Sequence, residues 1–443
     1  MSQATRGSQK FREHGCRLIL VWLVQEKPEA VVSMIDRRLA RRLAYYLLVL
    51  LGTAQSSAGF NRDGLCCVSK LGRALRARKV PTDASTDVER SVEFQLHTSI
   101  ASIPAEAWDG CHARDGSTSP FLEHSWLRCL EESKCASSKT GWVPQHVSIK
   151  IDGETKGYMP LYIKGHSLGE FIFDQAWADA AYQNGIEYYP KILSAVPFTP
   201  ATGSRILWHP SVVDEFDRED IRKLRRSIFR FVRQLAATNG LSSAHCNFLT
   251  EEEATDLAGP LNVDDTGDES VQDKVASLLQ RLQVKDDYIR RTSLQYHWHN
   301  RNPNNDGKPY ESFEDYLSCF KSKRRINIRR ERRRVHEDQN IRVDAVWGRE
   351  ILKIPGLLER MFEIYLSTID KMMWGRQYLT VDFFQMLGES SFIDNLCFMC
   401  ARMNTTSDEF RAEDVFAGTF SEWLVEYCGI DDSQADYLCN RHR

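Results

Sequence analysis

The sequence predicts an α/β protein with mixed sheets, and three observations support this fold class. Short runs of alternating apolar and polar residues, such as Val92–His97, are typical of half-buried strands. Longer runs with apolar residues on one helical face, such as Phe216–Asn239, alternate with them along the chain. The chain has 443 residues, of which 42% are hydrophobic and 27% charged, so it is long enough for two cores. We therefore expect two α/β units.

The first unit is predicted over residues 91–258. Asp152-Gly153 is a strong hairpin signal between two alternating runs, and Gly240 ends the longest helical run. In chain order we expect the strand Val92–His97, the helix Pro120–Glu132, a hairpin of Val143–Ile151 and Tyr158–Lys164, the strand Lys191–Val196, the helix Phe216–Asn239 and the strand Leu241–Leu249.

An acidic linker is predicted over residues 259–275, because this stretch is poor in large apolar side chains. The second unit is predicted over residues 276–420. Its expected elements are a short helix at Val271–Leu282 that begins at the linker, a strand at Tyr288–Trp298, helices at Phe313–Phe320 and Lys321–Asp338, a strand at Ile341–Val346, helices at Leu357–Ile369 and Val381–Leu387, and a hairpin of Leu396–Arg402 and Val415–Phe420.

Residues 1–90 differ in composition and are expected to be a targeting leader with a disordered segment. Arginines precede the apolar run Leu43–Leu51, small residues follow it, and a basic, acid-poor stretch continues to Val80. The apolar run is too short to span a bilayer, and Met34 just upstream is an alternative start. This order predicts a bipartite leader and an organelle, a plastid rather than a mitochondrion. The alternatives are a tail without an address and a cytoplasmic protein.

Composition limits the classes of partner. The net charge of −3 gives no overall field that would favour nucleic acid or a membrane surface. Twelve cysteines lie without repeated spacing, which predicts reduced thiols and no disulfide framework. The Cys397–Cys400 pair is a lone CxxC inside an apolar run, so we interpret it as core thiols and expect no metal site.

The densest cluster of informative residues lies between Gly157 and Arg205. Aromatic residues, prolines, glycines and charges alternate there as they do in the wall of a binding pocket. With Pro-Phe-Leu-Glu-His-Ser-Trp-Leu (120–127), Gln-Tyr-His-Trp-His-Asn (295–300), Trp-Gly-Arg-Gln-Tyr-Leu (374–379) and Phe-Ala-Gly-Thr-Phe (416–420), this block resembles the FemAB-like peptidoglycan biosynthesis/recognition group of the acyl-CoA N-acyltransferase (GNAT) superfamily. The resemblance runs from about Pro120 to about Phe420.

The resemblance implies tandem GNAT-like units and transfer of an acyl or aminoacyl group to an amine. Acyl-CoA is the preferred donor and would be a co-substrate, with no permanently bound cofactor. Aminoacyl-tRNA is the Fem-type option, and nucleic acid is not otherwise expected as a partner. The alternative is a non-catalytic module that binds a cell-wall-like or amino-sugar ligand. Residues 421–443 do not match the family's pattern, so the second unit is expected to be incomplete.

Five residues of the block are candidates for catalysis or for binding charged groups. Glu170 and Asp174 have aromatic neighbours, which suits a base or an ammonium-binding role, and the alternative is a surface pair near a turn. Tyr188 or Tyr189 is the candidate acid, and Lys191 is a candidate phosphate or carboxylate ligand. The alternative is that the tyrosine rings pack and Lys191 extends to solvent.

The remaining candidates lie among these five residues and downstream of them. Trp177 is a candidate for substrate contact, and Thr199, Thr202 and Arg205 are candidates for binding an anion or, alternatively, for a rigid turn. His297 is a candidate acid–base residue with Asn300 as its polar partner. Arg325 and Arg329 belong to the run Lys321–Arg334, whose nine basic residues would attract phosphates or form a solvated helix paired with the acidic residues 264–273.

Overall fold

The computed structural model describes residues 17–18, 90–111, 119–172, 174–183, 185–258, 288–292, 298–371, 376–404 and 409–422. The predicted leader (apart from 17–18 and 90), the linker 259–275, the helix Val271–Leu282, His297 and residues 423–443 lie outside them. The chain divides into two compact units. One comprises residues 21–112 and 136–291, and the other comprises 1–20, 113–135 and 292–443. We call them the 136–291 unit and the C-terminal unit.

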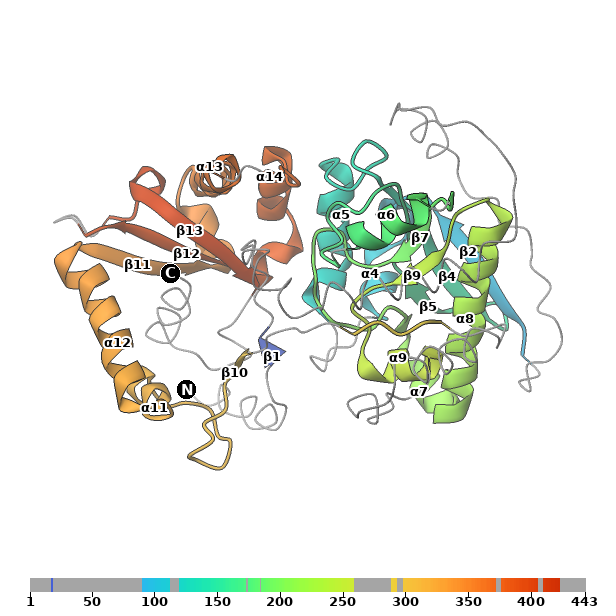
Figure 1. Ribbon diagram of the computed structural model, residues 1–443, viewed down its shortest axis with the longest axis horizontal. Helices are drawn as coiled ribbons and strands as arrows, with labels where there is room; N and C mark the ends of the chain where they lie inside the picture. Colours follow the sequence, from blue (N-terminus) through green and yellow to red (C-terminus); the bar gives the residue numbers. More distant parts are fainter. Residues whose placement is uncertain are drawn as a thin grey trace, which may run out of the picture. The chain divides into compact units, whose positions relative to one another are not determined.

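The 136–291 unit contains two four-stranded sheets, ordered β2-β4-β5-β8 and β3-β6-β7-β9 (Figure 1). Its elements are β2 (Val92–His97), η1 (Ile100–Ser102), α4 (Ala105–Asp109), β3 (Trp142–Pro144), β4 (His146–Ile151), β5 (Glu154–Met159), β6 (Tyr162–Lys164), α6 (Gln175–Gln183), β7 (Lys191–Ser194), β8 (Leu207–Trp208), α7 (Pro210–Glu215), α8 (Arg218–Thr238), β9 (Ala244–Cys246) and α9 (Glu251–Ala258).

The two sheets share one hairpin. The predicted turn at Asp152-Gly153 joins β4 to β5, which confirms the hairpin, and Asp152 and Gly153 both have positive φ. Each predicted strand is broken, however: β3 and β4 separate at Gln145, and β5 and β6 separate at Pro160 and Leu161. Because proline cannot donate to a ladder, the pairing shifts there, and Gln145 N–H bonds the carbonyl of Leu161 at 2.7 Å across the break. The strand partners change from β8 to β7 at this point.

Helix α8 covers the core of this unit. Its N-cap Asp217 accepts a hydrogen bond from the Asp220 N–H at 2.8 Å, and Gly240 follows the helix with φ of +66°. Apolar residues at helical spacing, Leu224, Ile228 and Phe231 among them, are buried on one face. They pack against strand residues such as Val147, Ile149, Met159 and Ile192. The predicted helix is confirmed, starting two residues later than expected.

The C-terminal unit contains a three-stranded antiparallel sheet, ordered β11-β12-β13, with α13 and α14 on one face (Figure 1). Its elements are η2 (Pro120–Leu122), α5 (His124–Glu132), α11 (Phe313–Ser318), α12 (Ser322–Arg333), a π-helical turn η4 (Arg334–Asp338), β11 (Ile341–Trp347), η5 (Gly348–Lys353), α13 (Leu357–Asp370), α14 (Val381–Glu389), η6 (Ser391–Asn395), β12 (Leu396–Met403), η7 (Ala412–Asp414) and β13 (Val415–Glu422). β10 (Trp298–His299) pairs with β1 (Arg17–Leu18) in a separate two-stranded sheet.

Helix α5 belongs to this second core, although it was predicted within the first unit. Trp126 packs edge-on against Phe383 of α14 with ring centroids 5.3 Å apart. The carboxylate of Glu123 accepts two hydrogen bonds from the Asn395 amide, at 2.9 and 3.0 Å. Because these contacts join residues far apart in sequence, local patterns could not assign α5 to its unit.

Other boundaries differ from the sequence prediction. The strand expected at Leu241–Leu249 is limited to β9. Residues 288–292 are not a strand, so the strand expected at Tyr288–Trp298 is reduced to β10 among the described residues. The helices α6, α7 and α9 were not predicted, and β13 continues two residues beyond the expected end of the unit. The predicted hairpin of β12 and β13 is confirmed.

Candidate active site

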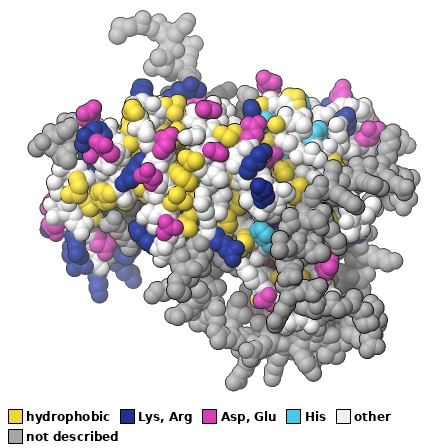
Figure 2. Space-filling view, turned by 90° about the horizontal axis from the view of Figure 1, so that it is seen from above, with side chains coloured by type: hydrophobic (Ala, Val, Ile, Leu, Met, Phe, Trp, Pro, Cys, Tyr) yellow, Lys and Arg dark blue, Asp and Glu magenta, His cyan; other side chains and the backbone are white. Residues whose placement is uncertain are grey.

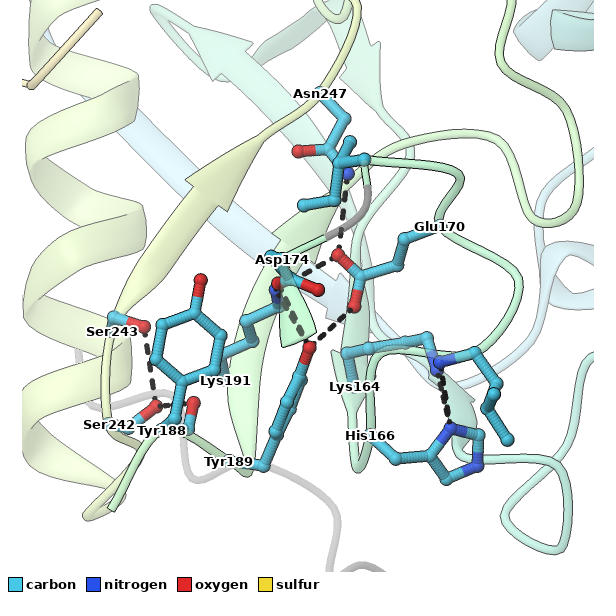
Figure 3. A network of polar contacts seen from close by, with 12 residues as sticks. Lys164, His166, Glu170, Asp174, Tyr188, Tyr189, Lys191, Ser242, Ser243 and Asn247 are labelled. Carbon is cyan, nitrogen blue, oxygen red and sulfur yellow. Dashed lines mark hydrogen bonds and ion pairs between the residues drawn. The ribbon is translucent and has the colours of Figure 1, made fainter. Parts of the chain in front are cut away.

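A cluster of buried charges lies where β6, β7 and β9 run side by side in the 136–291 unit (Figure 3). Lys191 is the first residue of β7 and Lys164 the last of β6, and the two pair in register. The segment after β6 carries Glu170 and Asp174 to the start of α6, and Asn247 follows β9. Strand pairing thus brings together side chains that are up to 83 residues apart.

Lys191 is the centre of the cluster. Its ammonium group lies 2.9 Å from Glu170 Oε2 and 2.9 Å from Asp174 Oδ2, and all three side chains are fully buried. The Tyr189 hydroxyl donates to Asp174 Oδ2 at 3.0 Å and lies 3.4 Å from Glu170 Oε1. The Asn247 amide reaches Glu170 Oε2 at 3.5 Å. The structure therefore places Glu170, Asp174, Tyr189 and Lys191 in one network, with Lys191 buried and without access to solvent.

The two carboxyl groups differ in proton affinity. Burial raises the pKa of Glu170, and the nearby Asp174 charge adds to this, although Lys191 opposes both. Burial also acts to raise the pKa of Asp174, but the charge and hydrogen bond of Lys191 and the two tyrosine hydroxyls outweigh it, so the pKa of Asp174 is lowered. Asp174 thus holds a negative charge while Glu170 is poised to take a proton, which is the pairing that acid–base chemistry needs.

One oxygen of the cluster is left over. Asp174 Oδ1 is buried and accepts no hydrogen bond of good geometry within the described part of the chain. Buried carboxylate oxygens are nearly always bonded, so an orphaned one indicates a place for a donor such as a ligand amine. Tyr188, whose hydroxyl lowers the pKa of Asp174, stacks edge-on with Tyr189 at 5.1 Å between ring centroids.

Two basic residues of the cluster were not predicted. Burial lowers the pKa of Lys164 to about 7, a change that Glu170 opposes and Lys191 reinforces. Burial and the Lys191 charge lower the pKa of His245, on β9, to about 3, so this imidazole is neutral near pH 7. Lys164 lies in the block between Gly157 and Arg205, but alternation alone could not show that its strand is buried on both faces.

Strained backbone surrounds the cluster. Three phenylalanines have φ of +56° to +59°. Phe171 follows Glu170, Phe198 lies in the 195–206 loop, and Phe248 follows Asn247. A left-handed conformation costs a bulky residue about 1–2 kcal/mol, and such strain gathers at functional sites. Gly169 has φ of +80°, and a Cβ there would lie 2.6 Å from the Phe198 ring. The loops are therefore held against one another at the expense of local conformational energy.

Arg205 has a different environment from the one predicted. It is fully buried, and its guanidinium group donates to the carbonyl oxygens of Ala201, Gly203 and Asn247 at 2.8–3.0 Å. Its backbone N–H donates to the buried carboxylate of Glu253. Because these carbonyls occupy the guanidinium donors, Arg205 organises the 195–206 loop, as the rigid-turn interpretation expects. Arg205 is still linked to Glu170 through Asn247, whose backbone carbonyl accepts from Arg205 and whose side-chain amide donates to Glu170.

The remaining candidates of this unit lie on its loops and on α6. Thr199 is buried and donates to the Pro197 carbonyl at 3.0 Å, and Thr202 is half-buried in the same loop. Trp177, on α6, is 54% exposed, and the Arg291 guanidinium lies 5.7 Å from its ring centroid. Only Trp177 among these three presents a large face to solvent.

The C-terminal unit holds the other predicted residues. Asn300 is buried, and its Oδ1 accepts the Tyr310 N–H at 3.0 Å. Arg325 donates to the Phe320 carbonyl at 2.6 Å, and Arg329 pairs with Glu314 of α11. Helix α12 has no buried residue, and the Arg332 guanidinium lies 4.2 Å from the Phe313 ring centroid. The three predicted residues belong to the C-terminal unit, and His297 lies outside the described residues.

The described residues contain no group of three or more His, Cys, Asp or Glu arranged to hold a metal ion. Cys397 and Cys400 are buried in β12 on opposite faces of the strand, since they are three residues apart. In the same part of the chain no helix has the length and apolar character needed to cross a bilayer. Positive and negative side chains are interspersed on the face shown in Figure 2.

Comparison with known proteins bears on the family and not on individual residues. No curated protein and no solved structure matches the chain. A family model described as FemAB-like, peptidoglycan biosynthesis/recognition, matches residues 99–409, which is more than half of the chain and includes the whole cluster around Lys191. The chain belongs to the FemAB-like peptidoglycan biosynthesis/recognition family.

Proposed function

We propose that the protein is an N-acyltransferase that moves an acyl or aminoacyl group from an activated carrier to an amine. The observation that carries the proposal is the buried network of Glu170, Asp174, Tyr189 and Lys191. Family membership supports a peptidoglycan-related transferase, and the network supplies the groups that acyl transfer to an amine requires.

In this proposal Glu170 is the general base. Attack by an amine on an acyl carbonyl requires the nitrogen to lose a proton, and a carboxylate with a raised pKa accepts that proton better than an ordinary one. Asp174, held ionised by Lys191, binds the ammonium form of the acceptor through its free Oδ1. Each group then has a separate task, set by its surroundings.

The tyrosines orient the carboxylates in this scheme. Burial and the neighbouring carboxylates raise the pKa of both Tyr188 and Tyr189, so both are weak proton donors. Their hydroxyls instead donate hydrogen bonds, as Tyr189 does to Asp174. We therefore propose that the tyrosines orient the carboxylates, in place of the acid role that the sequence suggested for them.

Acyl-CoA is the donor we propose, and aminoacyl-tRNA is the competing donor. The test is thermal denaturation of the full-length protein with coenzyme A, an acyl-CoA or a muropeptide, followed by mass spectrometry of amide products. A ligand at one hundred times its Kd stabilises the folded state by about 2.7 kcal/mol. Stabilisation by coenzyme A and acyl-CoA-dependent amide formation support the proposal. The proposal is refuted if no carrier stabilises the protein and no carrier gives an amide product.

A second candidate is a binding module for a cell-wall-like or amino-sugar ligand. The exposed ring of Trp177 favours it, because an aromatic face in solvent next to charged side chains suits a saccharide ring, and Tyr182 and Ile186 nearby are 43% and 46% exposed. This candidate predicts stabilisation by muropeptide alone, lost in Trp177→Ala, with no amide product from any donor.

A further inference from the structure

A second buried amine lies beside the proposed base. Lys164 and Lys191 occupy opposite positions on the antiparallel strands β6 and β7, and neither side chain is exposed. Residues opposite one another share a face of the sheet, and like charges in this arrangement repel. Two lysines in such a pair are therefore unexpected unless one of them can exist without its charge.

Lys164 has few groups that would hold it as a cation. Its Nζ lies 3.3 Å from His166 Nδ1, which also accepts the Leu168 N–H at 3.2 Å. The Trp142 ring lies beneath it, with the centroid 4.7 Å from Nζ. The titratable and charged groups facing it from the packed elements are Lys191 on β7, and Glu170 and Asp174 in the segment that leads into α6.

Lys191 already engages both carboxylates at 2.9 Å. Lys191 thus carries one positive charge between two carboxylates, and among the charged groups around Lys164 the Glu170 carboxylate most opposes the loss of its proton. Burial drives both Glu170 and Lys164 toward their neutral forms, because it raises the pKa of Glu170 and lowers that of Lys164 to about 7. Moving one proton from Lys164 to Glu170 leaves the net charge of the cluster unchanged, so the two groups titrate as a linked pair.

We propose that Lys164 is a positioning residue that acts through Glu170, the two side chains holding one proton between them. This inference rests on the transferase function proposed above. In the transfer the new C–N bond forms as the C–S or C–O bond to the carrier breaks, and the amine loses one proton. While Lys164 holds the proton of the pair as an ammonium, Glu170 is ionised and accepts the proton from the amine. Glu170 then passes that proton to the departing sulfur or oxygen, so the pair ends with the one proton it began with.

The first test needs no substrate. Full-length protein labelled with ¹³C at lysine Cε is titrated by NMR from pH 5 to 11. We expect one lysine signal to titrate near pH 7 and to be absent from Lys164→Met but present in the matched control Lys150→Met, a lysine of β4 in the other sheet. In Glu170→Gln the same signal should titrate at lower pH, because Glu170 raises the pKa of Lys164. A Lys164 signal that titrates with the other lysines, or one indifferent to Glu170→Gln, overturns the inference.

The second test uses turnover. Lys164→Met removes a charge that lowers the pKa of Glu170, so the acid limb of kcat/KM should move to higher pH. Lys164→Arg keeps a permanent charge and should move the same limb to lower pH. Opposite shifts are not expected of a purely structural residue, and equal shifts in one direction contradict the inference. If no donor gives turnover, the transferase proposal fails while the NMR titration still decides the link between Lys164 and Glu170.

Discussion

Removing the central cation is the sharpest perturbation of the cluster. In Lys191→Met, Glu170 and Asp174 lose an ammonium group 2.9 Å from each and remain buried. Breaking a buried ion pair by removing one partner costs about 3–5 kcal/mol. We therefore expect the amides of β6, β7 and β9 to exchange with deuterium roughly two to three and a half orders of magnitude faster in the variant near pH 7.

The loss should depend on pH. In the wild type the lowered pKa of Asp174 contributes stability that is present above the unfolded pKa and lost as the pH falls through the folded pKa. In Lys191→Met the charge that most opposes burial is gone, so the pKa of each carboxyl rises and protonation in acid relieves buried charge. The difference between variant and wild type should thus be smaller at pH 5 than at pH 8.

Peptide-resolved hydrogen exchange by mass spectrometry measures this effect and provides an internal reference, since β11–β13 should be unaffected. Lys156 offers a matched control, because it also bridges two carboxylates, but these belong to Glu154 and Glu215, whose side chains are 75% and 34% exposed. Lys156→Met should change protection little. Equal effects of the two substitutions, or no acceleration in β6 and β7, would refute the reasoning about buried charge.

Three further predictions concern residues around the cluster. Gly169→Ala should destabilise more than Gly185→Ala by about 1–3 kcal/mol in chemical denaturation, because both have positive φ but only the Cβ at 169 meets a ring, at 2.6 Å; equal losses would contradict this. Glu253→Gln should cost about 1–3 kcal/mol, since the buried N–H groups of Arg205 and Ile206 lose their carboxylate acceptor, and the loss should shrink between pH 5 and 8 because the raised pKa of Glu253 makes wild-type stability fall as pH rises; an unchanged midpoint would contradict it. The free energy of unfolding of Lys164→Met, relative to that of the wild type, should rise by about 1.4 kcal/mol per pH unit as the pH falls from 9 to 7, since the pKa of Lys164 is lowered to about 7; a pH-independent difference would exclude this lowered pKa.

The sequence predicted the local elements well and the tertiary ones less well. Periodicity identified α8, α13, α14 and the hairpin of β12 and β13, because each has a clear apolar face or alternation. It could not find the break at Gln145, since the change of strand partner there depends on β7 and β8. It also placed α5 with its sequence neighbours, while the aromatic contact of Trp126 with Phe383 depends on residues from the far end of the chain.

The candidate site shows the same division. The block from Gly157 to Arg205 was recognised, and the structure brings Glu170, Asp174, Tyr189 and Lys191 from it into one network. His245 comes from β9 and Asn247 from the residue after it, about forty residues downstream of the block, so no local pattern links them to the block. Composition also could not distinguish Arg205 as a ligand of carbonyl oxygens from Arg205 as a ligand of anions.

The central claim is that the buried cluster around Lys191 performs acyl transfer, and the turnover of Glu170→Gln tests it most directly. The substitution keeps the shape of the side chain and removes the base, while hydrogen exchange on the same sample reports whether β6 and β7 remain protected. Removing a general base typically lowers turnover by about 10²–10⁴-fold, and we predict a loss in that range of kcat/KM with retained protection. Turnover equal to that of the wild type in a folded Glu170→Gln protein would contradict the assignment.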